Sequence, residues 1–348
     1  ILSEINLVEE YYNTDPIALA VSGGPDSIAM MFLTSQSKKI KKENVTILTV
    51  DHDLRKDSFK EANIVMQNAK KIGFKCKILK WKGLKPTSGI QEAARRSRYD
   101  MMLSWCKENN VKKLFLAHHM DDQVETFLMR LSKGSGIDGL SSMSKKSNKE
   151  NINIIRPFLE IPKVKLVEIA NFSKMEWISD PSNSNLSYQR SRIRKLIPIL
   201  SKEGIDSHHI NLAIKRMDSA KDTLVKITNR GISKYVKNME DIAYSLSYEA
   251  INELSSEILL RILDRIIMVS SGSIYPPRRA KVESILSWLR SDSKIKKKTL
   301  SGTVIRKRKD YIICYRELKS SQRSPNIYPL TSRYLSWDNR FCIKLNKS

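Results

Sequence analysis

Six residues near the amino terminus have the composition of a phosphate-binding loop. They follow the apolar run 17–21 and read Ser22-Gly23-Gly24-Pro25-Asp26-Ser27. Where a strand gives way to a helix, backbone N–H groups and the helix dipole favour an anion, and glycines let it approach closely. Ser22 and Ser27 add hydroxyl donors, and Asp26 is placed to hold magnesium or to act on the reacting group. The segment therefore predicts a nucleotide phosphate site rather than an ordinary glycine-rich turn.

Two carboxylates open a predicted helix that runs through residue 130. Asp122 and Glu125 are three residues apart, so both lie on one face of its first turn. Acids at this position also stabilise a helix through its dipole, and the preceding His118 and His119 are candidates for core or capping residues. Because a phosphate loop is predicted on the same rim of the sheet, we favour a functional role for the two acids.

Arginines recur at helical spacing in two segments. Arg95 and Arg98 fall within one turn of the first, and Arg190 and Arg194 stack at i, i+4 in the second, after the rigid turn expected at 180–183. Guanidinium groups at such spacing suit contacts with phosphates. A solvated basic face is the alternative for both segments.

Two further segments are candidates for contacts with a nucleotide. His52 follows the apolar run 45–50, and ligands of open α/β sheets bind beyond the carboxyl ends of the strands. Gly134 and Ser135 belong to the glycine-rich segment 132–140, which is either a flexible connector or a second backbone cradle for a phosphate.

Apolar runs alternate with helical segments over the first two thirds of the chain. This alternation predicts an α/β fold, a doubly wound and mainly parallel sheet. The polar segment 145–150 is expected to be a surface loop. The expected strands are 17–21, 45–50, 75–79, 113–117 and 152–155, and the expected helices are 2–12, 28–33, 57–72, 90–107, 162–172 and 188–200.

The pattern changes after residue 203. We expect a catalytic domain over 1–203, a helical region over 204–272 and a small basic α+β domain over 273–348, with strands 299–305 and 311–315 forming a hairpin. Residues 278–309 hold twelve Lys or Arg and two acidic residues, which favours a surface that contacts RNA or DNA over a merely solubilising one.

Charge, cysteine content and hydropathy limit the kinds of partner, metal site and cellular location that this protein can have. The 348 residues carry a formal charge of +25, so a polyanionic partner is expected, unless surface lysines have simply accumulated. The four cysteines are scattered without a C-x-x-C pair, which argues against a zinc site, a redox pair or a disulfide framework. No apolar run has membrane-spanning length, and we expect a cytoplasmic protein.

The loop resembles that of the ATP pyrophosphatase (PP-loop) superfamily, and the whole series of motifs resembles the bacterial tRNA(Ile)-lysidine synthetase family. Order and spacing agree over about 16–200, whereas the last third fits more loosely. Asp53 and Ser191 stand where the family usually has Gly and Asn. The motifs are Ser22–Ser27, Val50-Asp51-His52-Asp53-Leu54-Arg55, Glu92-Ala93-Ala94-Arg95, Arg98-Tyr99, Ala117-His118-His119, Asp121-Asp122-Gln123, Glu125-Thr126, Gly134-Ser135-Gly136, Arg156-Pro157, Asp180-Pro181-Ser182-Asn183 and Arg190…Arg192…Arg194.

This resemblance implies ATP-dependent ligation of L-lysine to carbon 2 of the wobble cytidine of the CAU-anticodon isoleucine tRNA, through an adenylated intermediate, with Mg²⁺ as cofactor. A homodimer is one alternative for the oligomeric state. The roles it implies are catalysis by Asp26, Asp122 and Glu125, ATP binding by residues 22–27, His52, Gly134 and Ser135, lysine binding by Asp122 and Glu125, tRNA contacts by Arg95, Arg98, Arg190 and Arg194, and metal binding by Asp26.

Two other functions are weighed against this one. A PP-loop enzyme that thiolates tRNA needs reactive cysteines or an iron–sulfur site, and Cys76 and Cys106 lie far from the loop motifs in the sequence. A non-catalytic RNA-binding protein on the same scaffold would not need Asp26, Asp122 and Glu125, all of which are present.

Overall fold

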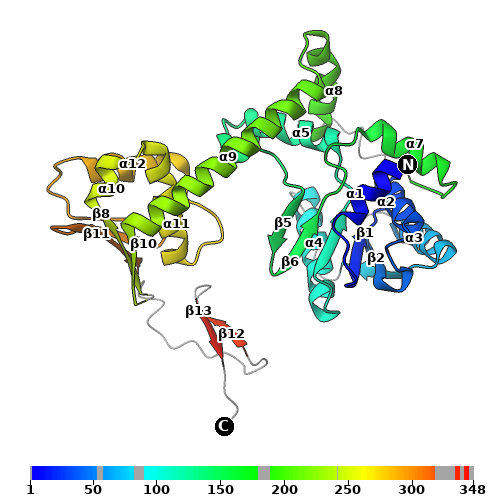
Figure 1. Cartoon of the computed structure of the whole chain (residues 1–348), viewed down its shortest axis with the longest axis horizontal. Coiled ribbons are helices and arrows are strands. Elements are labelled where there is room, and N and C mark those ends of the chain that lie inside the picture. Colours follow the sequence, from blue (N-terminus) through cyan, green and yellow to red (C-terminus); the bar gives the residue numbers. More distant parts are fainter. Residues whose placement is uncertain are drawn as a thin grey trace. The chain divides into compact units, whose positions relative to one another are not determined.

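A six-stranded, mainly parallel sheet organises the first of two compact units, residues 1–219 and 220–348 (Figure 1). The structure is a computed structural model. The predicted turn at 180–183 and the motif residues 53–55 lie outside the described residues. Described are residues 2–52, 58–81, 90–178, 189–240, 242–317, 334–337 and 341–344.

The strand order of this sheet is β3-β2-β1-β4-β6-β5. All neighbours pair in parallel except β5, which is antiparallel to β6 at the edge. The order reverses beside β1, between β1 and β4, where open α/β sheets bind their ligands. The prediction of a doubly wound, mainly parallel sheet is thus confirmed. The strands are β1 (Ile17–Ala20), β2 (Val45–Asp51), β3 (Lys75–Lys80), β4 (Lys113–Leu116), β5 (Lys146–Lys149) and β6 (Ile152–Ile155).

Helices cover both faces of the sheet because alternate residues of each buried strand point to opposite sides. Ile17 and Leu19 pack in one core with α1, α2, α3 and α7, whereas Ala18 packs in a second core with α4. The helices of this unit are α1 (Leu2–Glu9), α2 (Pro25–Gln36), α3 (Ser58–Ile72), α4 (Ile90–Glu108), α5 (Met120–Leu131), α6 (Ile137–Leu140), α7 (Lys163–Phe172) and α8 (Gln189–Lys202), with a short 3-10 helix at Lys42–Asn44.

The prediction of a surface loop at 145–150 is right about exposure but wrong about structure, because Lys146–Lys149 forms the strand β5. Its side chains are polar and mostly exposed, so its sequence carries no apolar alternation. Backbone pairing with β6 holds it in place, from Lys146 opposite Ile155 to Lys149 opposite Ile152. A charged, short strand of this kind is typical of a sheet edge.

An antiparallel sheet of order β7-β8-β11-β10-β9 organises the second unit, which also holds the carboxyl-terminal part of α9 (Ser207–Tyr235) and the helices that follow it. Buried residues of α11 and α12 pack in one core with Ile305 and Ile312 of the sheet. The elements are β7 (Val236–Met239), β8 (Ala243–Ser247), α10 (Tyr248–Glu253), α11 (Ser256–Ser271), α12 (Arg279–Arg290), β9 (Lys297–Leu300), β10 (Thr303–Lys307) and β11 (Tyr311–Arg316), with a separate pair of β12 (Tyr334–Trp337) and β13 (Phe341–Lys344).

The prediction of a single strand over 299–305 is also wrong, because two strands, β9 and β10, occupy this segment. Ser301 and Gly302 have φ values of +50° and +81°, which turn the chain back on itself between β9 and β10. The predicted hairpin with 311–315 is present as β10 and β11, so the segment is a three-stranded antiparallel arrangement.

The predicted domain boundaries fall between helices. Residue 203 lies between α8 and α9 (Ser207–Tyr235), and Gly272 caps the carboxyl end of α11 with a φ of +66°. The three-part division stays a prediction. Within the described ranges, no helix combines the length and the apolar character that crossing a bilayer requires.

Candidate active site

The predicted phosphate loop connects β1 to α2 and needs glycine at position 23. Gly23 has a φ of +89°, and a Cβ atom there would lie 2.7 Å from Cδ1 of Ile178. Its carbonyl accepts a hydrogen bond from the Ile178 backbone N–H at 2.9 Å. A side chain at this position would therefore meet both backbone strain and a steric clash.

Two serines close the loop on itself. Ser27 Oγ donates to the Gly24 carbonyl at 2.9 Å and accepts from the backbone N–H of Ser22 at 3.2 Å. Gly24 caps α2, and Pro25 occupies the first turn, where its missing N–H leaves no helix bond unmade. The loop thus has a fixed shape at the amino end of α2, where the helix dipole favours an anion.

Asp26 follows the loop in the first turn of α2, and its side chain is 23% exposed. Its Oδ1 is buried and makes no hydrogen bond within the described part of the chain. Its Oδ2 lies 3.5 Å from Nε2 of His119, the residue that caps α5 after β4. The two sides of the switch point, after β1 and after β4, therefore meet through these two side chains.

His119 is 3% exposed and is surrounded by acids. With Asp122 it forms a capping box, in which the His119 N–H donates to Asp122 Oδ2 at 3.1 Å. His119 Nδ1 has two neighbours that require opposite protonation states. It lies 3.4 Å from the Asp122 backbone N, whose N–H it could accept only if Nδ1 carried no proton. It also lies 3.5 Å from Asp121 Oδ2, to which it could donate only if Nδ1 carried a proton. With three carboxylates within 3.5 Å, we assign the imidazolium form, in which Nδ1 faces Asp121 as a donor and only the bond from the His119 N–H to Asp122 remains of the capping box.

The pKa values agree with this assignment. Burial opposes the charged form of His119, but hydrogen bonds with Asp121 and Asp26 and the charge of Asp122 raise its pKa to about 9. For Asp122, burial opposes ionisation, whereas the charges of His119 and Arg190 lower the pKa of the carboxyl group below its usual value. His118 shows the reverse, because burial lowers its pKa to about 3.

Two arginines of α8 hold the two predicted catalytic acids of α5. Arg190 donates from Nη2 to Asp122 Oδ1 at 2.6 Å and from Nε to Glu125 Oε2. Arg194 donates from Nε to Oε1 of Glu125 and from Nη2 to Oε2 at 3.4 Å. Glu125 is 2% exposed, so this is a nearly buried ion-pair network. We call the whole group the carboxylate cluster: Asp26, Asp121, Asp122, Glu125, His119, Arg190 and Arg194.

The remaining predicted residues occupy three places. His52 directly follows β2 and accepts a hydrogen bond from Nε of Arg98 at 3.3 Å. The Arg95 guanidinium lies 5.7 Å from the centre of the Tyr99 ring on the same helix. Gly134 and Ser135 follow the carboxyl end of the 12-residue α5, about 18 Å along the helix from its amino end. Their part in nucleotide binding stays a prediction.

Sequence reasoning gave no catalytic or binding role to His119, although the structure places it between Asp26 and the acids of α5. A signal was available, since His119 and Asp122 have the three-residue spacing of a capping box. The sequence motifs also do not show the pairing of Arg190 and Arg194 with Asp122 and Glu125, because they predict tRNA contacts for the arginines and catalysis for the acids.

Comparison with known proteins identifies the class. The family described as the PP-loop domain matches residues 3–200. A U34-tRNA thiolase from Methanococcus maripaludis shares the fold, with a TM-score of 0.53 at 19% identity over 62% of this chain and 78% of that one. The chain is a PP-loop protein, and the predicted superfamily is confirmed.

Curated relatives narrow the class further. The tRNA(Ile)-lysidine synthase of Wolbachia pipientis is 39% identical over 95% of this chain and 77% of its own length. That of Rickettsia akari is 33% identical over 99% of this chain and 79% of its own length. The chain belongs to the tRNA(Ile)-lysidine synthase family, as its motifs predict.

Proposed function

We propose that this chain is a ligase that joins L-lysine to carbon 2 of the wobble cytidine in the CAU-anticodon isoleucine tRNA, consuming ATP and releasing AMP and pyrophosphate. The observation that carries the proposal is the meeting of Asp26 and His119 across the switch point of a PP-loop fold. Family membership makes ATP and tRNA its substrates.

The reaction needs two steps because the carbonyl oxygen on carbon 2 of cytosine is a poor leaving group. Attack of that oxygen on the α-phosphate of ATP forms an AMP ester, which leaves readily. Residues 22–27 hold the departing pyrophosphate through backbone N–H groups and the hydroxyl of Ser22, and the Ser27 hydroxyl would reach it only by leaving the Gly24 carbonyl. The lysine amine then attacks carbon 2 and displaces AMP.

Asp26 fits a magnesium ligand. Its Oδ1 is buried without a hydrogen bond to the described residues, and an ionised carboxylate oxygen in that state needs a cation or a donor. Magnesium is usually held by one or two carboxylates together with substrate phosphates. When bound, the ion would spread the charge of the pyrophosphate.

The carboxylate cluster suits a cationic substrate. It has four carboxylates against three cations (His119, Arg190 and Arg194), so one net negative charge remains. A carboxylate offers about four acceptor positions, and Glu125 uses three of them in its bonds to the arginines. We assign the lysine ammonium to Asp122 and Glu125, where it takes a free acceptor position or replaces a guanidinium, and one of the carboxylates, including Asp26, accepts its proton.

Basic residues of both units would contact the tRNA. Arg95 and Arg98 lie on α4 of the first unit, and we propose contacts with phosphates for both. Arg190 and Arg194 would reach phosphates only by leaving Glu125. In the second unit, Lys298 and Lys307 lie 5.3 and 5.2 Å from the centre of the Trp288 ring. Phosphate contacts of this kind make affinity depend on salt.

The proposal also covers the domain division, the cellular location and the oligomeric state. We propose three domains (1–203, 204–272 and 273–348) and a cytoplasmic location, where the tRNA substrate is found. A homodimer is one alternative for the assembly, and light scattering of the purified protein distinguishes it from a monomer by mass.

One incubation tests the function. Protein, ATP and radiolabelled lysine are mixed with the CAU-anticodon isoleucine tRNA, with the same tRNA carrying uridine at the wobble position, or with no RNA. Label is expected only in the first tRNA, with one AMP released per lysine joined. Binding of the tRNA without transfer of label would contradict the proposal and would favour an RNA-binding protein.

A further inference from the structure

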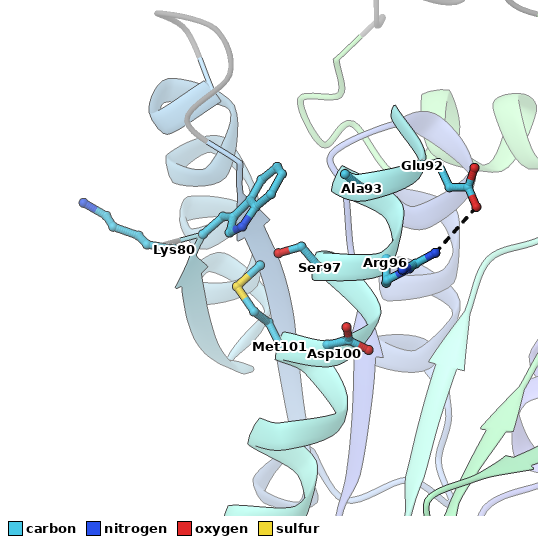
Figure 2. Close-up of a pocket in the computed structure, with 8 residues that line it drawn as sticks. Lys80, Glu92, Ala93, Arg96, Ser97, Asp100 and Met101 are labelled. Carbon is cyan, nitrogen blue, oxygen red and sulfur yellow. Dashed lines mark ion pairs between the residues drawn. The ribbon is translucent and has the colours of Figure 1, made fainter. Parts of the chain in front are cut away.

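A cavity of about 650 Å³ lies between the end of β3 and the amino-terminal half of α4, outside the carboxylate cluster (Figure 2). Its volume falls within the range of about 300–1,000 Å³ that is usual for small-ligand sites. We call it the Trp81 pocket. It is lined chiefly by Lys80, Trp81, Ala93, Arg96, Ser97 and Met101.

One wall of the Trp81 pocket is a stripe of α4. Ala93, Ser97 and Met101 are spaced four residues apart, so they lie on one face of the helix. In Figure 2, Ser97 and Met101 point from this helix towards the strand that carries Lys80. Small side chains at 93 and 97 leave room between helix and strand, and Met101 adds a polarizable thioether that suits contact with an aromatic ring.

The other wall holds a fixed aromatic ring. The Trp81 backbone N–H donates to the Asp51 carbonyl at 3.0 Å, which continues the pairing of β3 with β2. The ring lies edge-on to His52, with 6.0 Å between ring centres and an angle of 87°. His52 in turn accepts a hydrogen bond from Arg98. The pocket is thus joined by direct contacts to the end of β2, on the rim that carries the phosphate loop.

The edge of the pocket faces solvent and is charged. Arg96 and Glu92 lie 3.8 Å apart, with side chains that are 75% and 83% exposed. Lys80 is exposed at the opposite edge, and its ammonium group lies 4.9 Å from the centre of the Phe59 ring. The lining carries two cations, Lys80 and Arg96, and two acids, Glu92 and Asp100, so it has no net charge. What suits it to RNA is the aromatic ring beside a slot open to solvent, because a base can stack on such a ring whatever its sequence.

We propose that the Trp81 pocket stacks an unpaired base of the tRNA anticodon loop next to the wobble cytidine. This inference rests on the proposed function. Chemistry on the wobble base requires that base to leave its stack, which deprives its neighbour of a stacking partner. Trp81 supplies a replacement surface two strands from β1, about 10 Å along the sheet from the phosphate loop.

Removing the ring tests the proposal. The probe is an anticodon stem–loop RNA with the CAU loop, and its dissociation constant is measured by filter binding with the full chain. Base–aromatic stacking contributes about 1–3 kcal/mol, so Trp81→Ala is expected to weaken binding by roughly 5- to 150-fold, whereas Trp81→Phe keeps most of the affinity. Ser97→Phe, which fills the slot and leaves Trp81 in place, should weaken binding as Trp81→Ala does.

The matched control is Phe172→Ala, which removes an aromatic side chain that is 65% exposed on α7. It should leave RNA affinity unchanged. Unchanged RNA affinity in both Trp81→Ala and Ser97→Phe, with wild-type melting temperatures, overturns the proposal. Weaker ATP binding with unchanged RNA affinity also overturns it, because the pocket then holds the adenine ring. The failure of the wild type to transfer lysine would instead refute the proposed function, whatever the RNA affinities.

Discussion

Arg190 on α8 donates a hydrogen bond from Nη2 to Oδ1 of Asp122 on α5 at 2.6 Å. The same guanidinium also donates to Glu125, so one side chain of α8 bridges two acids that lie on one face of α5. The residues are 68 positions apart in the chain. In a nearly buried ion pair of this kind each charge compensates the other, so removing either side chain leaves an uncompensated charge in the protein interior.

Arg190→Met is therefore expected to destabilise the protein. Breaking a buried ion pair by removing one partner costs about 3–5 kcal/mol, and the lower end applies because the Arg190 side chain is 32% exposed. Urea denaturation measures the change. Lys195→Met, an exposed residue of the same helix on another face, is the control and should change the free energy of unfolding by about 0.5 kcal/mol or less. Equal effects of the two variants would contradict the network.

Gly23→Ala is expected to weaken ATP binding and to destabilise the loop. The positive φ of Gly23 alone costs alanine about 1–2 kcal/mol, and the contact with Ile178 adds to this. The double variant Gly23→Ala with Ile178→Ala relieves the clash but keeps the backbone strain, so a partial recovery of stability is expected. Full recovery in thermal unfolding would show that the backbone at position 23 is not strained.

Asp26→Asn should abolish lysine transfer with little change in stability. The substitution keeps the shape of the side chain but removes the charge that we assign to magnesium, and a loss of about 100- to 1,000-fold in rate is expected. Asp15→Asn changes an exposed acid of the same unit and should leave the rate unchanged. A rate near that of the wild type in purified, folded Asp26→Asn would remove Asp26 from the mechanism.

The raised pKa of His119 leads us to expect a loss of stability at alkaline pH. Its folded pKa of about 9 lies above the usual value of 6.5, so its contribution is complete below pH 6.5 and is lost as the pH rises through 9. The difference corresponds to about 3 kcal/mol. His119→Asn keeps a side chain that caps helices well but does not titrate. Urea unfolding with a chelator present should show a fall between pH 6.5 and 9 in the wild type only.

The described thiols are expected to be unreactive in the folded protein. Burial raises the pKa of Cys76 to about 11 and that of Cys106 and Cys314 to about 12. Alkylation by iodoacetamide at pH 8 should be slower than for a free thiol by on the order of 100-fold or more. Mass spectrometry of each site separates these residues from Cys342. A loss of lysine transfer that follows modification of Cys76 or Cys106 would favour thiol chemistry.

The sheet was predictable because its strands are short, apolar and bounded by polar residues. Ile17, Leu19 and Ala18 are fully buried, and their run is too short for a typical helix and is followed by paired glycines, which favours a buried strand. Lys146–Lys149 has no such signal, since a polar edge strand is held by backbone pairing that the side chains do not record. The break at Ser301 and Gly302 was missed because a two-residue turn lay inside a run of strand-forming residues.

The candidate site was predictable in its parts but not in its connections. The loop at 22–27 and the acids Asp122 and Glu125 are motifs of neighbouring residues, and the sheet topology brings them to one rim. The partners of these acids come from α8, which no local pattern links to α5. From the sequence alone, a charged side chain can be expected to contact either water or a charged partner, and only the tertiary structure shows which of the two it contacts.

The separation of these partners also sets an order of events during synthesis. Asp122 leaves the ribosome 68 residues before Arg190, and at about 5–20 residues per second this interval lasts roughly 3–14 s. The phosphate loop closes on itself within residues 22–27 and needs nothing from α8. During this interval Asp122 and Glu125 have no guanidinium partner from α8, so burying their charges in a folded unit would carry the full cost of desolvation until α8 has been made.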